Sequence, residues 1–360
     1  MEMFFLMTSW LAAGPGCLAG VVALSAPLEA LERYADIIRC SGFTVMITRS
    51  GGGVHWVTRI RIYRRNLFGD ELVATTTLGK NNDFARLSHN LGTVCIDDDL
   101  HFFGGTFQNP GNQEKPGILH AVGKLSESYS SRFQIVRRPQ LALKGTWNGC
   151  IERRNHPGFL NKTCEFDGKI SAAYHNRRLY LFVRANLSGQ NGARHLQVVT
   201  GRIDNNTLDI IWSSFQLLEF QFYRRGLPEN NIYYMNVHLW QGRFIGVFPA
   251  VHGLKARGGV YVSISDDSVR WSFPILVMKT RSFGQRSRIH PVRITDEGVL
   301  LYLEGVNLPE TPEDESAVFD GPMLRAVQLN ATFHAMPRHE TVDINLLAWS
   351  SRHDGILGCL

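Results

Sequence analysis

One stretch of the sequence decides the fold: residues 170–183 read ISAAYHNRRLYLFV, an apolar run, a polar turn and a second apolar run. Both runs are rich in aliphatic and aromatic residues, and the turn between them contains asparagine and two arginines. This composition predicts two antiparallel strands joined by a tight turn. The same pattern recurs at 91–103, 232–248 and 291–303. The chain therefore contains a repeated hairpin, which indicates a repeat architecture.

Each hairpin is followed by further strand-like runs, so the repeating unit has more than two strands. Third strands are expected at 118–122, 196–199, 260–264 and 324–329. Two of the units then end in a similar fourth strand-like run, at 211–218 and 270–277. Four strands per unit describe the blade of a β-propeller, whose faces become buried only when neighbouring blades stack.

A fifth unit is expected from strand-like runs at 54–63 and 71–75, with 342–349 completing it. We therefore predict an all-β, five-bladed β-propeller with four-stranded antiparallel blades around a central funnel, over residues 41–360. The innermost strands are expected near 90–96, 166–173, 231–237 and 289–294. Beyond the helical pattern over Leu28–Ile38, no helix longer than about ten residues is expected. A pair of packed β-sheets is the alternative.

The composition excludes some classes of protein. Of 360 residues, 44% are hydrophobic, which is enough for a packed core and argues against wholesale disorder. Lys+Arg total 38 and Asp+Glu 32, a formal net charge of +6. No run of five like charges is present, so nucleic acid is not expected as a partner. A mild positive charge is compatible with an acidic glycan.

The N-terminal segment, residues 1–28, is predicted to be a secretory signal peptide or a signal-anchor. No charged residue occurs from Met3 to Leu28, and Ala23 and Ser25 have the small side chains that a cleavage site needs. The alternative is a buried apolar segment. Four glycosylation triplets agree with export, at Asn161, Asn186, Asn205 and Asn330. We expect a secreted glycoprotein whose contact with a membrane, if any, is through this segment.

Six cysteines are present, and two of them bracket a polar loop. Cys150 and Cys164 are predicted to form a disulfide if the chain is exported, which would stabilise the loop by roughly 3 kcal/mol. Cys95 lies in an apolar strand-like run and is expected to be a buried thiol. No paired Cys/His spacing occurs, so neither a metal site nor a cofactor is expected.

Two segments carry a resemblance to a known superfamily. Residues 164–169, CEFDGK, precede a hairpin, and residues 265–272, SDDSVRWS, follow a third strand. Together with the repeat, they resemble the five-bladed propeller glycosidases, the arabinanase/xylosidase-like family 43 and the invertase-like family 32. The second segment is similar to a turn seen in many of these enzymes, and we interpret it as a turn that stabilises a blade.

The resemblance implies acidic residues near the start of each innermost strand, where the ligand lies over the funnel. Glu165 and Asp167 match a carboxylate position, with Asp167 expected to matter most. Where a base Asp is expected, the first unit has His89 and Asn90. The third unit has Asn231 and Tyr233 where an acid Glu is expected, and the fourth has His290. These non-acidic residues are the candidate substrate-binding residues.

Two more residues join the candidate site. Asp83 is the candidate to replace the missing base, if its loop folds over the funnel. Arg184 follows the second unit's hairpin and could bind a carboxylate or sulfate, although a salt bridge between blades is the alternative.

Three functions remain open at this point. The resemblance implies a glycoside hydrolase that acts on an oligo- or polysaccharide. The second is a glycan-binding propeller without catalysis, and the third is a scaffold that binds proteins. A second carboxylate in the funnel distinguishes hydrolysis from binding, since the two glycosidase geometries place their carboxyl groups about 5–10 Å apart.

Overall fold

The computed structural model describes residues 21–22, 33–50, 57–66, 69–87, 91–105, 117–125, 133–144, 166, 169–186, 194–204, 206–221, 231–232, 234–240, 242–252, 257–280, 288–295, 298–304 and 323–327. Apart from two short 3₁₀ turns, every regular element in these ranges is a β-strand. The all-β class expected from the sequence is therefore confirmed.

The first two sheets each contain four antiparallel strands in chain order. The first consists of β2 (Arg33–Cys40), β3 (Phe43–Ser50), β4 (Val57–Asn66) and β5 (Gly69–Leu78). The 3₁₀ turns η2 (Lys80–Asn82) and η3 (Phe84–Arg86) follow it. The second consists of β6 (Gly92–Ile96), β7 (Asp99–Gly105), β8 (Gly117–Leu125) and β9 (Phe133–Lys144).

The third and fourth sheets follow the same plan. The third consists of β10 (Ser171–His175), β11 (Arg178–Asn186), β12 (Arg194–Ile203) and β13 (Ile210–Trp212), with β14 (Gln216–Leu217) also paired to β12. The fourth consists of β16 (Asn231–Ile232), β17 (Asn236–Trp240), β18 (Arg243–His252), β19 (Arg257–Ser265) and β21 (Ile275–Thr280). Between these two sheets, β15 (Glu219–Phe220) pairs in parallel with β20 (Arg270–Trp271).

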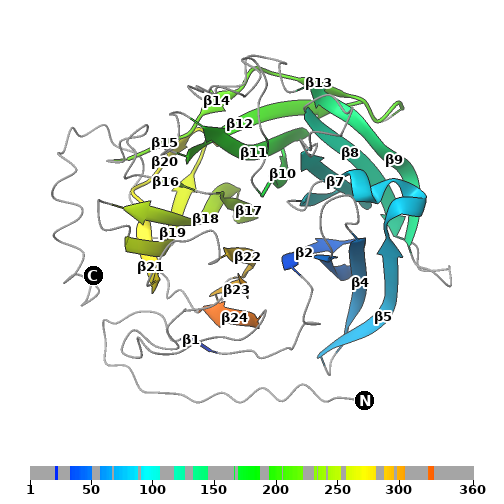
Figure 1. Cartoon of the computed structure of the whole chain (residues 1–360), viewed down its shortest axis with the longest axis horizontal. Helices are drawn as coiled ribbons and strands as arrows, with labels where there is room; N and C mark the ends of the chain where they lie inside the picture. The colour runs from blue at the N-terminus through cyan, green and yellow to red at the C-terminus, as the bar shows by residue number, and fades with distance from the viewer. Residues whose placement is uncertain are drawn as a thin grey trace.

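The fifth sheet consists of β22 (Arg288–Thr295), β23 (Gly298–Glu304), β24 (Met323–Val327) and β1 (Val21–Val22). The innermost strands contact one another in turn: β2 with β6, β6 with β10, β10 with β17, β17 with β22, and β22 with β2. Figure 1 shows the sheets around a common centre, with β2, β10, β17 and β22 nearest to it. The arrangement is therefore propeller-like, and it is not the sheet pair considered as the alternative.

The expected innermost strands agree closely with β6, β10, β16, β17 and β22, but the start of the first sheet does not agree. That sheet begins at Arg33 rather than after residue 41, and β2 lies where the sequence pattern predicts a helix up to Ile38. Pairing with β3 and packing between sheets outweigh the helix preference of this segment. β1 lies within the expected signal or anchor segment, whose processing stays a prediction.

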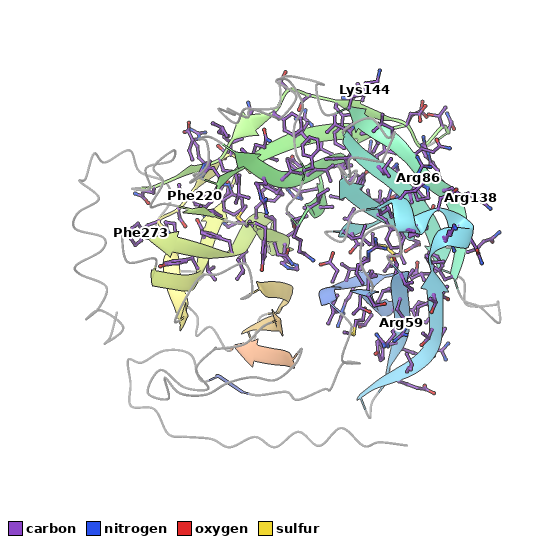
Figure 2. All side chains as sticks on the ribbon, in the orientation of Figure 1. Arg59, Arg86, Arg138, Lys144, Phe220 and Phe273 are labelled. Carbon is purple, nitrogen blue, oxygen red and sulfur yellow. A yellow bond between two sulfur atoms is a disulfide. The ribbon has the colours of Figure 1, made fainter. Side chains whose placement is uncertain are left out.

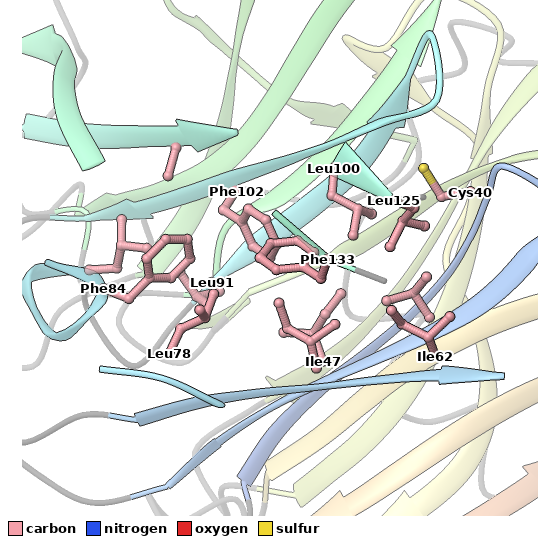
Figure 3. Close-up of a cluster of buried hydrophobic side chains, with 14 of the residues drawn as sticks. Cys40, Ile47, Ile62, Leu78, Phe84, Leu91, Leu100, Phe102, Leu125 and Phe133 are labelled. Atoms are coloured by element: carbon pink, nitrogen blue, oxygen red, sulfur yellow. The ribbon is translucent and has the colours of Figure 1, made fainter. Parts of the chain in front are cut away.

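Clusters of buried side chains fill the interfaces between neighbouring sheets. Ile47 and Ile60 of the first sheet pack with Phe102 and Leu119 of the second, as the close-up in Figure 3 shows for part of this cluster. A second cluster joins the second and third sheets, and a third cluster joins the third and fourth. The sheets therefore pack face to face, as blades of a propeller do, because one sheet alone cannot bury both of its faces.

The turn between β19 and β20 confirms the interpretation of the SDDSVRWS segment as stabilising. Asp267 Oδ1 accepts hydrogen bonds from the backbone amides of Val269 at 3.0 Å and Arg270 at 2.7 Å. The Trp271 indole is fully buried, and it donates to the Ser268 carbonyl at 3.0 Å. Because β20 pairs with β15, this turn also holds the chain that leaves the third sheet against the fourth.

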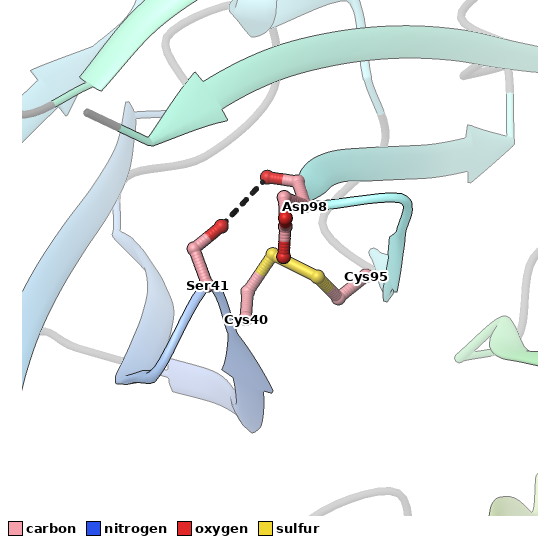
Figure 4. Close-up of a disulfide and its surroundings, with 4 residues drawn as sticks. All are labelled: Cys40, Ser41, Cys95 and Asp98. Atoms are coloured by element: carbon pink, nitrogen blue, oxygen red, sulfur yellow. Dashed lines mark hydrogen bonds between the residues drawn. A yellow bond between two sulfur atoms is a disulfide. The ribbon is translucent and has the colours of Figure 1, made fainter.

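A disulfide joins Cys40, at the end of β2, to Cys95 on β6, with Cα atoms 5.4 Å apart (Figure 4). The prediction that Cys95 is a buried thiol is therefore wrong. The reason is that β2 and β6 are neighbouring innermost strands, which brings together cysteines 55 residues apart. Cys150 and Cys164 lie outside the described residues, so their disulfide stays a prediction.

Candidate functional site

A buried network of polar side chains joins the first three sheets at their innermost strands. Asp36, on β2, accepts hydrogen bonds at Oδ2 from the Thr93 hydroxyl at 2.6 Å and from the Thr93 backbone amide at 3.1 Å. Its Oδ1 lies 3.2 Å from Nζ of Lys169. The Lys169 side chain is only 1% exposed and that of Asp36 is 11% exposed. A carboxylate and an ammonium group are thus held together near the centre of the molecule.

The local structure of the inner strands places these three residues. Asp36 lies next to an irregularity in the pairing of β2 with β3, and such bulges redirect the side chains beside them. Thr93 lies near the start of β6, and Lys169 lies two residues before β10. Each residue is thus in the first half of an innermost strand or just before it. This is the level at which the resemblance described above predicts the ligand.

The polar network continues from the third sheet to the fourth. The hydroxyl oxygen of Ser171, the first residue of β10, accepts a hydrogen bond from the backbone amide of Val237 on β17 at 2.8 Å. The neighbouring Asn236 side chain is buried, at 2% exposure. Side-chain hydrogen bonds thus connect neighbouring innermost strands near their starts.

The charges in this network are balanced. A buried carboxylate is costly unless it is paired and hydrogen-bonded, and Asp36 satisfies both conditions through Thr93 and Lys169. Within the described first halves of the innermost strands, Asp36 is the only carboxylate at this level. Hydrolysis by two carboxylates therefore needs a partner for Asp36 from another part of the chain.

Arg184, predicted to bind substrate, lies at the same end of the third sheet as Lys169. The register of β10 and β11 pairs Ser171 with Phe182, and Arg184 lies two residues further toward that end. Its side chain is buried, at 5% exposure, and its carbonyl accepts a hydrogen bond from Gln197 Nε2 at 2.9 Å. The structure thus brings Arg184 and Lys169 to the same level of the third sheet.

Asp83 occupies a different position. It lies between the two 3₁₀ turns, and its carboxylate is 3.6 Å from Arg138 on β9, the outermost strand of the second sheet. Figure 2 shows Arg138 at the outer margin of the molecule. Fully buried Arg49 holds this connection by donating to the carbonyls of Phe84 and Leu87, and burial lowers the pKa of Arg49 to about 9. Among the described residues, the Asp83 carboxylate thus contacts β9, and the adjoining η3 contacts β4 and β9 rather than the innermost strands.

The other candidate residues are placed only in part. His89, Asn90, Glu165, Asp167 and Tyr233 lie outside the described residues. The backbone of Asn231 begins β16, where it pairs with Val251. That of His290 lies in β22, where it pairs with Tyr302. Their roles stay predictions.

Sequence reasoning missed Asp36, Thr93 and Lys169. A usable signal was present for Asp36, because residues 34–49 repeat the strand, turn and strand pattern around the turn Ser41–Gly42. The helical pattern over Leu28–Ile38 obscured it. Lys169 belongs to the segment that carries the resemblance, but the resemblance predicts acidic residues and not a lysine at this level.

Within the described residues, no helix has the length and apolar character of a membrane span. No group of three or more His, Cys, Asp and Glu side chains there could hold a metal ion.

Comparisons with known proteins give a likeness of fold. No protein-family model matches the chain, and no curated protein sequence matches it. A GH43_1 enzyme from Xanthomonas citri is similar at a TM-score of 0.53 and 8% identity, covering 90% of this chain and 98% of that one. The enzyme complexed with xylose matches at 0.51 and 10% identity, covering 84% and 89%. The complex with xylotriose matches at 0.52 and 9% identity, with the same coverage.

At these identities the likeness concerns the fold alone. It confirms that the resemblance inferred from the repeat was correct at the level of architecture, since the chain shares the propeller fold of a glycoside hydrolase over most of its length.

Proposed function

We propose that this chain is an exported, carbohydrate-active five-bladed propeller with its functional site at the axis, where it acts as a glycoside hydrolase. The observation that carries the proposal is the buried Asp36–Thr93–Lys169 network on the innermost strands of three sheets. The closed sequence of contacts among the innermost strands supports the count of five blades. The Cys40–Cys95 disulfide supports export, because disulfides persist mainly in oxidising compartments.

Asp36 is the first of the two carboxylates that hydrolysis requires. It lies on the innermost strand of the first sheet, so it replaces His89 and Asn90 as the candidate for the base position. Asp167 is the proposed second carboxylate, because it precedes Lys169, which contacts Asp36, by only two residues. Glu165 is the alternative. One carboxyl group would protonate the leaving oxygen while the other activates water or attacks the sugar.

A glycan-binding protein without catalysis is the second candidate, and one observation favours it. Both oxygens of Asp36 are engaged, one by Thr93 and the other by Lys169. A carboxylate whose two oxygens are both bound to protein groups has less room to contact a water molecule or a sugar hydroxyl than a free one. In this case the network would shape the site, and Arg184 would help to bind the sugar.

The proposed substrates are oligo- or polysaccharides, including acidic ones. Arg184 puts a cationic side chain at the same end of the third sheet as Lys169, whose own charge is balanced by Asp36, and guanidinium groups bind carboxylates and sulfates bidentately. The net charge of +6 agrees with this preference. Because the similar Xanthomonas citri enzyme was solved with xylose and xylotriose, neutral xylo-oligosaccharides belong in the same panel.

The test is a reducing-sugar assay over a panel of neutral and acidic oligosaccharides, with binding measured in parallel by calorimetry. Asp36→Asn and Asp167→Asn are each expected to lower turnover by about a hundredfold or more, the usual scale for acid–base groups. Asp209→Asn is the matched control, because Asp209 is exposed and pairs only at the surface with Arg137. Its turnover should be unchanged.

The outcomes separate the two candidates. Binding without turnover by the wild-type chain would establish the glycan-binding alternative. Full turnover by both acidic-site variants would exclude these residues from catalysis. Neither binding nor turnover across the panel would overturn the carbohydrate proposal. Melting temperatures of all variants show whether a loss of turnover reflects unfolding instead.

A further inference from the structure

Two buried histidines form a hydrogen-bonded pair in the second sheet, outside the candidate site. His101, on β7, and His120, on β8, are 2% and 1% exposed. Nδ1 of His101 lies 2.9 Å from Nε2 of His120, and the two rings stack with centroids 5.1 Å apart. Phe103 stacks on the other side of His120 at 4.7 Å.

The pair lies on the face of the second sheet that packs against the third. Side chains alternate along a strand, so His101 shares a face with Phe103, and His120 shares a face with Ile118. Both of these apolar residues belong to the cluster that joins the second and third sheets. The histidines are therefore part of the interface between two blades.

Within the described part of the chain, the hydrogen bonding offers no acceptor for a further proton on His120. With both rings neutral, one nitrogen of the 2.9 Å contact donates and the other accepts. Among the described residues, Nδ1 of His120 has no hydrogen-bond partner. A positively charged His120 would thus bury an N–H donor without an acceptor, and a positively charged His101 would bury a charge against the same apolar interface.

Burial and nearby charges also disfavour the protonated forms of both histidines. Burial lowers the pKa of His101 to about 4. Burial, followed by the charges of His101 and Arg137, holds the pKa of His120 well below its usual range. On β9, Arg137 is paired at 2.8 Å with Asp209, which lies just before β13 of the third sheet, so this carboxylate is already engaged. The described groups that act on the pair are thus cationic or already neutralised.

The same interface connects the pair to the candidate site. On its outer side, Trp212 of the third sheet donates its indole N–H to the Ala142 carbonyl of the second at 2.9 Å. On its inner side, Lys169, two residues before β10, contacts Asp36 of the first sheet, and Thr93 of β6 donates to the same carboxylate. A movement of the third sheet against the second would therefore change the Asp36–Lys169 contact.

We propose that His101 and His120 form an acid-sensitive switch in the interface between the second and third sheets. The neutral pair holds the interface closed, and protonation of either ring in an acidic compartment opens it. The stabilising contribution is fully present above the ordinary histidine pKa of about 6.5 and is lost as the pH falls toward the folded-state value.

The test compares urea unfolding at pH 7.5 and pH 4.5 for the wild-type chain and for His101→Leu/His120→Phe. This double variant removes both titrating rings together with their mutual hydrogen bond, so it leaves neither partner unsatisfied. For the wild type, a folded-state pKa of about 4 predicts that His101 alone raises the unfolding equilibrium constant about 70-fold on acidification. The double variant should lack at least this part of the loss.

A matched control is Phe103→Leu, which weakens the same stack without removing a titrating group and should lower stability equally at both pH values. Equal losses on acidification for the wild type and the double variant would overturn the proposal. If the double variant does not fold, hydrogen exchange of the wild type at pH 7.5 and pH 5, corrected for intrinsic rates, decides. Faster exchange confined to β7, β8 and the third sheet supports the switch, and a uniform increase refutes it.

Discussion

Replacing both cysteines of the Cys40–Cys95 disulfide with alanine should destabilise the protein by about 4 kcal/mol. The bond closes a loop between residues 55 apart in sequence, and the chain-entropy model gives about 4 kcal/mol for a loop of this length. With an unfolding entropy of about 2.1 cal/mol/K per residue over 360 residues, this corresponds to a fall in melting temperature of about 5 °C. Differential scanning calorimetry measures the shift directly.

Reduction supplies the internal control for this prediction. A reductant should lower the melting temperature of the wild type by at least the shift seen in the Cys40→Ala/Cys95→Ala variant. Thiol titration of the unfolded, unreduced wild type should detect at least two fewer thiols than the six cysteines of the sequence. Six titrating thiols, or a melting temperature unchanged within 1 °C in the double variant, would refute the reasoning from the structure.

Two further predictions concern buried and capped charges. Lys169→Met should destabilise the protein by about 3–5 kcal/mol, because it leaves Asp36 buried without its cation, whereas Lys169→Met/Asp36→Leu should recover most of that loss in urea unfolding. Burial would raise the pKa of Asp267, but hydrogen bonds from Arg270 and Val269 and the charge of Arg270 lower it overall. Its stabilising contribution is therefore present above its ordinary pKa and is lost as the pH falls through the lowered value, so Asp267→Asn should flatten the decline of melting temperature below about pH 4. An unchanged decline would show that this carboxylate does not contribute.

The repeated hairpins could be predicted because they depend on local chemistry. A few consecutive residues are enough to show the alternation of a strand or the residue types of a turn. The turns at Asp97–Asp98 and Asn176–Arg177 adopt the positive φ angles that two-residue hairpin turns need. The order of strands within the first two sheets follows from such hairpins. The position of Arg184 at the same end as Lys169 was predictable for the same reason, since it follows from its place after a hairpin.

The first sheet shows where local chemistry is insufficient. Residues 28–38 carry a helical pattern, yet β2 pairs with β3 and contacts both β6 and β22. An innermost strand is packed on both sides, so its apolar residues need not alternate, and the sequence pattern then indicates a helix as readily as a strand. Because a helix was predicted where β2 lies, Asp36 was not predicted as a site residue.

The sequence by itself determined the class of fold and the repeating unit, and it indicated the start of each innermost strand as the level of the candidate site. These features depend on neighbours within a few residues. Only the tertiary structure decided that Asp36, Thr93 and Lys169 meet, that Cys40 bonds to Cys95 and that Asp83 lies among the outer strands. These facts depend on which innermost strands become neighbours when the sheets pack around one centre. Burial of whole sheet faces determines which innermost strands become neighbours, and a short stretch of sequence does not contain this information.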